Sequence, residues 1–225
     1  MQKIFAKIVG LFFGLRAKTR LLGYAPYPEA ATNTLYNLLF CDDLALAKLN
    51  SSTSSEASWS VLSSAPADRA ALEELALDSS RETPVRVFAY HALLKTAFMA
   101  AKKELLGIIV EVGLKAGLET LAAYNDGRTT YIDASGHATV RDTADREIMT
   151  GVRKLFQAGE AAVAQTGPWD KSRLIPPPQG VVRITLLVSD GLYFGHGPIG
   201  VLQQDPIGGP VLKIAAELVA VLAAK

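Results

Sequence analysis

The chain has 225 residues, enough for one domain of ordinary size with a substantial apolar core. Its 23 Lys and Arg residues nearly balance 22 Asp and Glu residues, and the net charge of +1 argues against a general nucleic-acid binder. The hydrophobic share of 49% and the mean hydropathy of +0.21 are high for a soluble monomer. Two explanations are open: a large core, or an apolar surface covered by a partner, a second copy or a membrane.

Cysteine and histidine are scarce. Cys41 is the only cysteine, so no disulfide can form within the chain, and this favours a reducing, cytoplasmic compartment. The three histidines, His91, His137 and His196, are far apart in the sequence and match no zinc-binding spacing. We therefore expect no metal and no cofactor, although a carboxylate-rich metal site stays open.

The first 23 residues combine apolar residues at helical spacing with the densest positive charge in the sequence. Three interpretations are open: a helix docked on the core, a helix lying on an anionic membrane surface, or a signal peptide. The signal peptide is least favoured because Lys7 interrupts the apolar run, and the run is too short to span a membrane. The residues that would contact a membrane surface are Lys3, Lys7, Phe12, Phe13, Arg16, Lys18 and Arg20.

The next part of the chain predicts helices separated by a Ser-rich stretch. A helix is expected from Glu29 to Leu49, and it would contain Cys41-Asp42-Asp43, whose carboxylates favour a structural rather than a nucleophilic cysteine. Residues 51–64 are the predicted linker or loop. They would separate an N-terminal helical segment (1–50) from an α+β core domain (65–225).

Two further helices are expected before the first strand. One covers residues 66–77, and the other begins at Pro84 after the capping residue Thr83 and runs to Glu104. His91 lies on the apolar side of the second helix, which favours a structural role over a catalytic one.

Residues 105–142 predict a run of antiparallel strands. Leu105–Leu114 is apolar and rich in β-branched residues, which is typical of a strand buried on both faces. Alternation places Leu106 and Ile108 on one face and Ile109 and Glu111 on the other. Glu111 would either serve a function or pair with an arginine such as Arg183, and pairing is favoured slightly.

Two turns would connect these strands. Asp126-Gly127 is typical of a two-residue type I′ turn, and Ser135-Gly136 would form a second turn. The predicted cross-strand pairs are Tyr124 with Thr129, Ala122 with Tyr131, Leu121 with Ile132, and Tyr131 with Val140. Asp133, Ser135 and His137 contain the letters of a hydrolase triad, but their crowding into one turn indicates turn chemistry.

The last third of the chain predicts a helix, a second hairpin and a closing helix. The first helix would be capped by Asp142 or Thr143 and end near Gln165. Pro176–Pro178 is interpreted as a rigid connector and, as an alternative, as a ligand for an aromatic groove. Val181–Gly195 would turn at Asp190-Gly191. The predicted pairs there are Val188 with Tyr193 and Leu187 with Phe194. The closing helix would follow Gly208-Gly209-Pro210 and run to about Ala224.

The segment from Gly195 to Gly200 is the most suggestive candidate for ligand binding. A glycine-rich loop can offer backbone N–H groups to phosphates, and a histidine can assist. The G-x-G-x-x-G spacing is present, but it follows a hairpin strand and Pro198 removes one donor, so a tight turn at a pocket rim is favoured. The candidate ligand-binding residues are Gly195, His196, Gly197, Gly200 and Glu111.

Together these elements predict an α+β fold. One antiparallel sheet of about five to six strands, from the meander 105–142 and the hairpin 181–196, would be flanked by helices. The element order is similar to that of profilin-like and roadblock-like folds. This is a likeness of element order alone, and no residue role follows from it.

Three functions are compatible with the sequence. The favoured hypothesis is a non-catalytic protein-interaction or regulatory module that self-associates, with a protein partner or a second copy and no nucleic acid. The first alternative is a small-ligand or nucleotide-binding protein, or an enzyme, with a pocket near 195–200. The second is a peripheral membrane protein attached through residues 1–20. No catalytic residue is identified.

Overall fold

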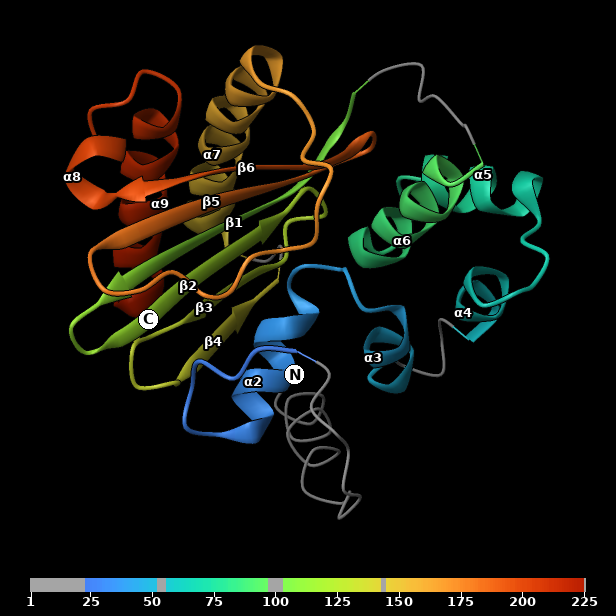
Figure 1. The fold of residues 1–225 in the computed structure, drawn as a ribbon, viewed down its shortest axis with the longest axis horizontal. Coiled ribbons are helices and arrows are strands. Elements are labelled where there is room, and N and C mark those ends of the chain that lie inside the picture. The colour runs from blue at the N-terminus through green and yellow to red at the C-terminus, as the bar shows by residue number, and fades with distance from the viewer. Residues whose placement is uncertain (1–22, 52–55, 97–102, 143–144, 225) are drawn as a thin grey trace.

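The computed structural model describes residues 23–51, 56–96, 103–142 and 145–224, and it shows an α+β fold with one open antiparallel sheet (Figure 1). The six strands are ordered β4-β3-β2-β1-β5-β6, so β4 and β6 form the edges. The strands are β1 (Leu105–Leu114), β2 (Gly117–Tyr124), β3 (Thr129–Ile132), β4 (Ala138–Arg141), β5 (Val181–Val188) and β6 (Gly191–Pro198). The predicted fold class is confirmed.

Helices cover both faces of this sheet. Behind it in Figure 1 lie α7 (Arg146–Gln165) and α9 (Gly208–Ala223), which pack against each other. The N-terminal half of the chain covers the other face. Its helices are α2 (Ala30–Leu38), α3 (Leu44–Leu49), α4 (Glu56–Leu62), α5 (Arg69–Leu77) and α6 (Thr83–Leu94). The sheet is thus the middle of three layers, and the short α8 (Ile199–Leu202) follows β6.

Each face of the sheet has its own apolar core, and β1 contributes to both. Ile109 belongs to the front core, which the sheet forms with α2 to α6, and Ile108 belongs to the back core, formed with α7 and α9. The predicted faces of these two residues are confirmed. Leu106 was expected on the same face as Ile108. A register irregularity between Leu105 and Gly107 instead directs its side chain to the front core.

The two turns of the meander are one residue longer than predicted. Gly127 has a φ of 87° and donates its N–H to the Tyr124 carbonyl, while the Tyr124 N–H bonds the Arg128 carbonyl. This is a three-residue loop, a type I turn closed by a left-handed glycine. Gly136, with a φ of 90°, closes the second turn in the same way.

The longer turns shift the predicted register by one residue. The observed pairs are Ala123 with Thr129, Ala122 with Thr130, Leu121 with Tyr131, Thr120 with Ile132, and Tyr131 with Thr139. Because side chains alternate between faces, a one-residue shift moves each side chain of β3 to the other face. Ile132 therefore lies in the front core and Tyr131 in the back core, the reverse of the prediction.

The hairpin of β5 and β6 keeps a loop of two residues, but this loop lies one residue earlier than predicted. Val188 pairs with Gly191 instead of Tyr193, and Leu187 pairs with Leu192 instead of Phe194. Ser189 and Asp190 therefore form the tip instead of Asp190 and Gly191. A shift of two residues keeps every side chain on its predicted face.

The predicted helix from Glu29 to Leu49 is interrupted after Leu38, where Cys41 takes a φ of 51°. Asp43 then caps α3, because its carboxylate accepts the Leu46 N–H at 2.9 Å. The continuous helix was a wrong prediction, since an aspartate stabilises a helix start better than a helix interior. Cys41 is buried, and burial raises the pKa of its thiol, in agreement with a structural role.

Part of the predicted Ser-rich linker is helical. Glu56–Leu62 forms α4, in which Trp59 and Leu62 are buried. The Trp59 and Phe88 rings meet edge to face with centroids 5.9 Å apart. The predicted loop was therefore wrong for Glu56–Leu62, because the burial of an aromatic side chain outweighs the weak helix preference of serine. The division into domains stays a prediction.

Two helix boundaries also differ from the prediction. The helix expected over Pro84–Glu104 ends at Leu94, and Lys103 and Glu104 are not helical. Asp145 caps α7, accepting the N–H groups of Glu147 and Ile148, whereas Asp142 or Thr143 was expected. Among the helices described, none is long and apolar enough to cross a membrane.

Candidate functional site

Residues 166–180 connect α7 to β5 and cross the front face of the sheet; this segment is called the strap below. Gly113 on β1 leaves room for the carbonyl of Pro178, which any side chain there would displace. Three residues before Pro178, the Ile175 carbonyl accepts a hydrogen bond of 2.8 Å from Arg183 Nη1. Pro176–Pro178 thus lies in the connection that enters β5, as predicted, and its rigidity stays a prediction.

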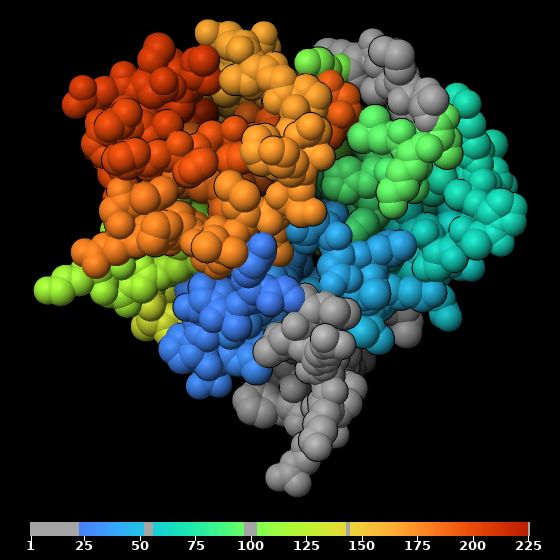
Figure 2. Space-filling view, in the orientation of Figure 1, coloured from blue at the N-terminus to red at the C-terminus, as the bar shows by residue number. Residues whose placement is uncertain are grey.

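Arg173 anchors the strap to α2. Its guanidinium carbon lies 3.9 Å from the centre of the Phe40 ring, and its side chain is only 7% exposed. Its Nε donates to Asp42 Oδ2 at 2.7 Å and its Nη2 to Asn37 Oδ1 at 2.9 Å. Figure 2 shows the result on the surface, where the orange strap lies directly beside the blue α2.

A buried ion pair lies beneath the strap. Arg183 on β5 faces Glu111 on β1, and it donates from Nε to Oε2 at 2.7 Å and from Nη2 to Oε1 at 2.9 Å. Tyr36 of α2 donates its hydroxyl to the same Glu111 Oε1 at 2.6 Å. The side chain of Glu111 is fully buried and that of Arg183 is 4% exposed. The favoured pairing of Glu111 with Arg183 is confirmed.

Strand β6 presents part of its backbone to the outside of the sheet. Its Leu192 carbonyl accepts a hydrogen bond from Trp169 in the strap, so the backbone groups of Leu192 point away from β5. In an antiparallel strand, the direction of the backbone N–H and C=O groups alternates from residue to residue. The backbone groups of Phe194 and His196 therefore also point away from β5. Within the described residues, no hydrogen bond reaches the backbone N–H or C=O of Phe194 or His196. This is the free edge of β6.

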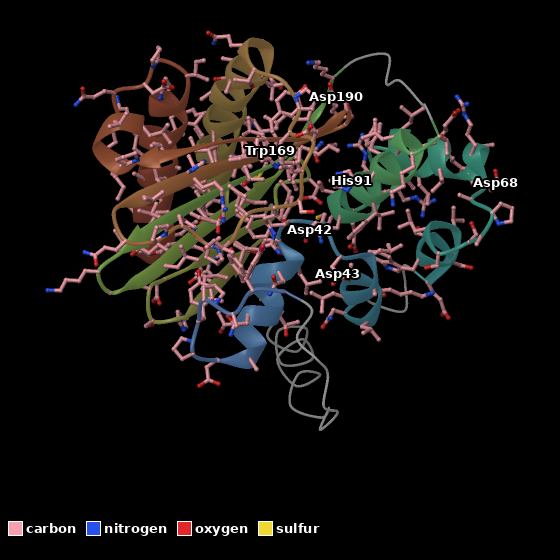
Figure 3. The ribbon with its side chains drawn as sticks, viewed as in Figure 1. Asp42, Asp43, Asp68, His91, Trp169 and Asp190 are labelled. Atoms are coloured by element: carbon pink, nitrogen blue, oxygen red, sulfur yellow. The ribbon has the colours of Figure 1, made fainter. Side chains whose placement is uncertain are left out.

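A row of aromatic side chains follows this free edge. The rings of Trp169 and Phe194 meet edge to face with centroids 4.5 Å apart, and the Phe194 and His196 rings stack at 5.7 Å. Lys171 Nζ lies 5.3 Å from the centre of the Trp169 ring. Figure 3 shows Trp169 beside β6. His196 is exposed, and its neighbour across the strand pair is Arg183.

The glycines expected in a loop belong to two regular elements. Gly195 and Gly197 alternate with the aromatic row within β6, and Gly200 lies in α8. The favoured tight turn was therefore a wrong prediction for Gly195–Pro198, because the ladder with β5 continues to Pro198. A Cβ at Gly195 or Gly197 would meet no atom within 4 Å, so one face of this edge carries no side chains. A ligand role for Gly195, His196, Gly197, Gly200 and Glu111 stays a prediction.

Exposed apolar side chains lie in two segments that contact β5 or follow β6. Ile175 in the strap, whose carbonyl accepts a hydrogen bond from the Arg183 side chain, is 69% exposed. Val201 in α8, directly after β6, is 65% exposed. An unpaired strand with an exposed apolar side chain next to it is a surface that can accept a further strand.

The other titratable candidates take part in local structure. Asp133 Oδ1 accepts the Ser135 hydroxyl and the N–H groups of Ser135 and His137, which confirms the turn interpretation. His91 lies beside Asp42 where α6 faces the end of α2 (Figure 3). Burial lowers the pKa of His91, in agreement with a structural histidine.

Outside the strap and β6, the described part of the chain offers a groove. A shallow groove of about 500 Å³ lies between α7 and α9, with Gly151 and Leu218 among its lining residues. The described residues contain no cluster of three or more His, Cys, Asp or Glu side chains that could hold a metal. The seven predicted membrane-surface residues lie outside the described residues.

The sequence did not identify Trp169, Phe194 and Arg173 as parts of this site. The alternation of Phe194 and His196 with Gly195 and Gly197 was the available signal, because it places rings on one face of a strand and bare backbone on the other. The position of Trp169 depends on long-range contacts of the strap, for which no local pattern exists.

Comparisons with protein-family models, with curated proteins and with solved structures find no match to this chain.

Proposed function

We propose that the protein is a non-catalytic interaction module that self-associates by strand addition at the free edge of β6. The observation that carries this proposal is the outward backbone of Phe194 and His196, which finds no hydrogen-bond partner among the described residues. A second copy can supply the missing donors and acceptors and extend the antiparallel sheet.

A second copy suits this edge better than a folded protein of unrelated shape. Two identical strands can pair about a two-fold axis, so the same short surface serves both partners. The exposed Val201, in the helix directly after β6, would lie beside the junction, where a second copy would cover it. The high apolar share of the sequence agrees with such covered surface.

The test is the mass of the protein in solution after an edge substitution. His196→Pro removes an outward N–H and leaves the ladder with β5 intact, because an edge strand tolerates proline at such a position. We expect the wild type to form dimers in sedimentation equilibrium and His196→Pro to associate at least roughly tenfold more weakly, a loss of about 1.4 kcal/mol. Circular dichroism would verify that the variant is folded.

Two further variants make the test specific. Val140→Pro is the matched control, because Val140 lies at an outward position of the opposite edge strand β4 and is 40% exposed. It should dimerise like the wild type. Gly195→Lys adds a charge where a Cβ meets no atom, and it should also weaken association. A wild type that stays monomeric at every concentration would overturn the proposal.

The two alternatives from the sequence also stay proposals with their own tests. Thermal-shift screening with nucleotides and metabolites tests a small-ligand site near Gly195–Gly200. Liposome flotation of the chain with and without residues 1–20 tests membrane attachment, and equal flotation of both would contradict it.

A further inference from the structure

The free edge of β6 has a definite length. At one end the strap occupies it, because Trp169 is already bonded to Leu192 with an N···O distance of 2.6 Å. At the other end β6 stops at Pro198 and the chain turns into α8 at Ile199. The stretch open to pairing is therefore Phe194–Pro198, and its midpoint is His196.

These boundaries choose between two symmetric registers. With the two-fold axis at Gly195, Pro198 of the second copy would fall opposite Leu192, where Trp169 already lies. With the axis at His196, Pro198 of the second copy falls opposite Phe194. No residue of the paired stretch then lies opposite Leu192. The second register is free of this collision.

The register centred on His196 also uses the outward backbone groups. The His196 residues of the two copies would exchange both N–H···O=C bonds, as directly opposed outward residues do in an antiparallel pair. The Phe194 N–H of each copy would donate to the Pro198 carbonyl of the other. Pro198 has no N–H, so it can act only as an acceptor there.

This register brings the two His196 side chains together. Directly opposed residues have their Cβ atoms about 5 Å apart on one face of the sheet. The charged neighbour of His196 on β5 is Arg183. Its guanidinium donates from Nε and Nη2 to the two carboxylate oxygens of Glu111. On the strap, Lys171 lies over the Trp169 ring and the exposed Asp170 follows Trp169 in the chain, while α8 (IGVL) has no charged side chain. The two protonated His196 side chains would lie directly opposite each other, and like charges repel in such a pair.

We propose that a second copy pairs with β6 about an axis at His196, so that protonation of the two His196 side chains opposes self-association. This inference rests on the proposed function and adds the register and the control by pH. Histidine ordinarily changes charge between about pH 5 and 8, so association is strong above this window and weak below it. Like charges directly opposite each other on a sheet destabilise the pair.

The test is sedimentation equilibrium of the full chain at about pH 8 and about pH 5.5, on either side of the histidine window. We expect the wild type to associate at least roughly tenfold more weakly at the lower pH. His196→Gln removes the titrating group and should dimerise equally at both values. His137→Gln, which changes an exposed turn histidine, should keep the wild-type dependence. Circular dichroism at both pH values would verify that each protein is folded.

The outcomes separate the two proposals. Wild-type dimers of equal strength at both pH values, sensitive to His196→Pro, would overturn the His196 register and leave strand addition intact. A monomer at both pH values would overturn strand addition itself. A pH dependence that persists in His196→Gln would assign the effect to another group and overturn the inference.

Discussion

Glu111 joins three parts of the molecule through one buried carboxylate. Its two oxygens accept hydrogen bonds from Arg183 on β5 and from Tyr36 on α2, so β1, β5 and the front helical layer meet at this residue. A buried charge is tolerated when it is paired and its lone pairs are satisfied, and this geometry meets both conditions. Burial, followed by the negative charge of Glu111, raises the pKa of Tyr36, so its hydroxyl stays a donor.

Removing the charge of Glu111 should be costly. Glu111→Gln keeps the shape of the side chain but leaves the Arg183 guanidinium, 4% exposed, without a counter-ion. We expect the free energy of unfolding to fall by about 3–5 kcal/mol, measured by urea denaturation with circular dichroism. Tyr36→Phe removes one hydrogen bond to the carboxylate and should cost about 1.5–3 kcal/mol.

The matched control is an ion pair of similar geometry at the surface. Arg69 and Glu73 on α5 lie 2.7 Å apart with side chains 61% and 35% exposed. Glu73→Gln should change stability by no more than about 0.5 kcal/mol, because solvent screens an exposed i,i+4 pair. A Glu111→Gln variant as stable as this control would show that the buried pair contributes nothing to the fold.

At the scale of elements, the sequence predicted the presence of the strands and of the helix over 146–165 well, but it extended two helices too far and missed the turn geometry. The bounds of β1 were predicted to the residue, because Gly107, Gly113 and the β-branched apolar run disfavour the alternative of a continued helix. Gly127 and Gly136 were correctly placed in turns, but an Asp-Gly or Ser-Gly pair fits both a two-residue and a three-residue loop. The choice between those loops depends on how both faces of β3 pack, which the local sequence does not contain.

The candidate site was predictable to a similar extent. The pairing of Glu111 with Arg183 followed from the need to neutralise a carboxylate on an apolar strand. His196 was singled out, but as part of a loop. The strap contacts were not predictable, because Arg173 meets Asp42 and Asn37 across more than a hundred residues of sequence.

The strap should depend on the flat guanidinium of Arg173. Arg173→Lys keeps the charge but loses the stacking on Phe40 and the two directed bonds to Asp42 and Asn37. We expect backbone amides of the strap, including that of Trp169, to exchange hydrogen roughly tenfold faster, which corresponds to about 1.4 kcal/mol of local stability. Hydrogen–deuterium exchange with mass spectrometry measures this.

The control for the strap lies on the back layer. Arg153 is exposed on α7, so Arg153→Lys should leave exchange in the strap unchanged. Amides within α7 should exchange at wild-type rates in both variants. Unchanged protection of the strap in Arg173→Lys would mean that the proline run and the Ile175 bond hold it without Arg173.

On the scale of the whole molecule, β1 couples the two cores. Its Ile108 and Ile109 are both fully buried but belong to opposite faces of the sheet. Unfolding the front layer alone would expose Ile109 and strip Tyr36 from Glu111, while β1 remained in the back core. Such a half-unfolded state would expose apolar surface of the front core but gain only part of the conformational entropy of the unfolded chain. We therefore expect a single cooperative unfolding transition.

The two tryptophans of the chain allow a direct test of this coupling. Trp59 lies in the front layer and Trp169 at the edge of β6, so Trp169→Phe and Trp59→Phe leave one reporter in each region. The indole N–H of Trp59 is buried without a hydrogen-bond partner among the described residues, so Trp59→Phe removes no bond that is seen there. In each variant, the urea midpoint from fluorescence should coincide with that from circular dichroism. A Trp59 midpoint at clearly lower urea would show instead that the front helices unfold as a separate unit, leaving the sheet with α7 and α9.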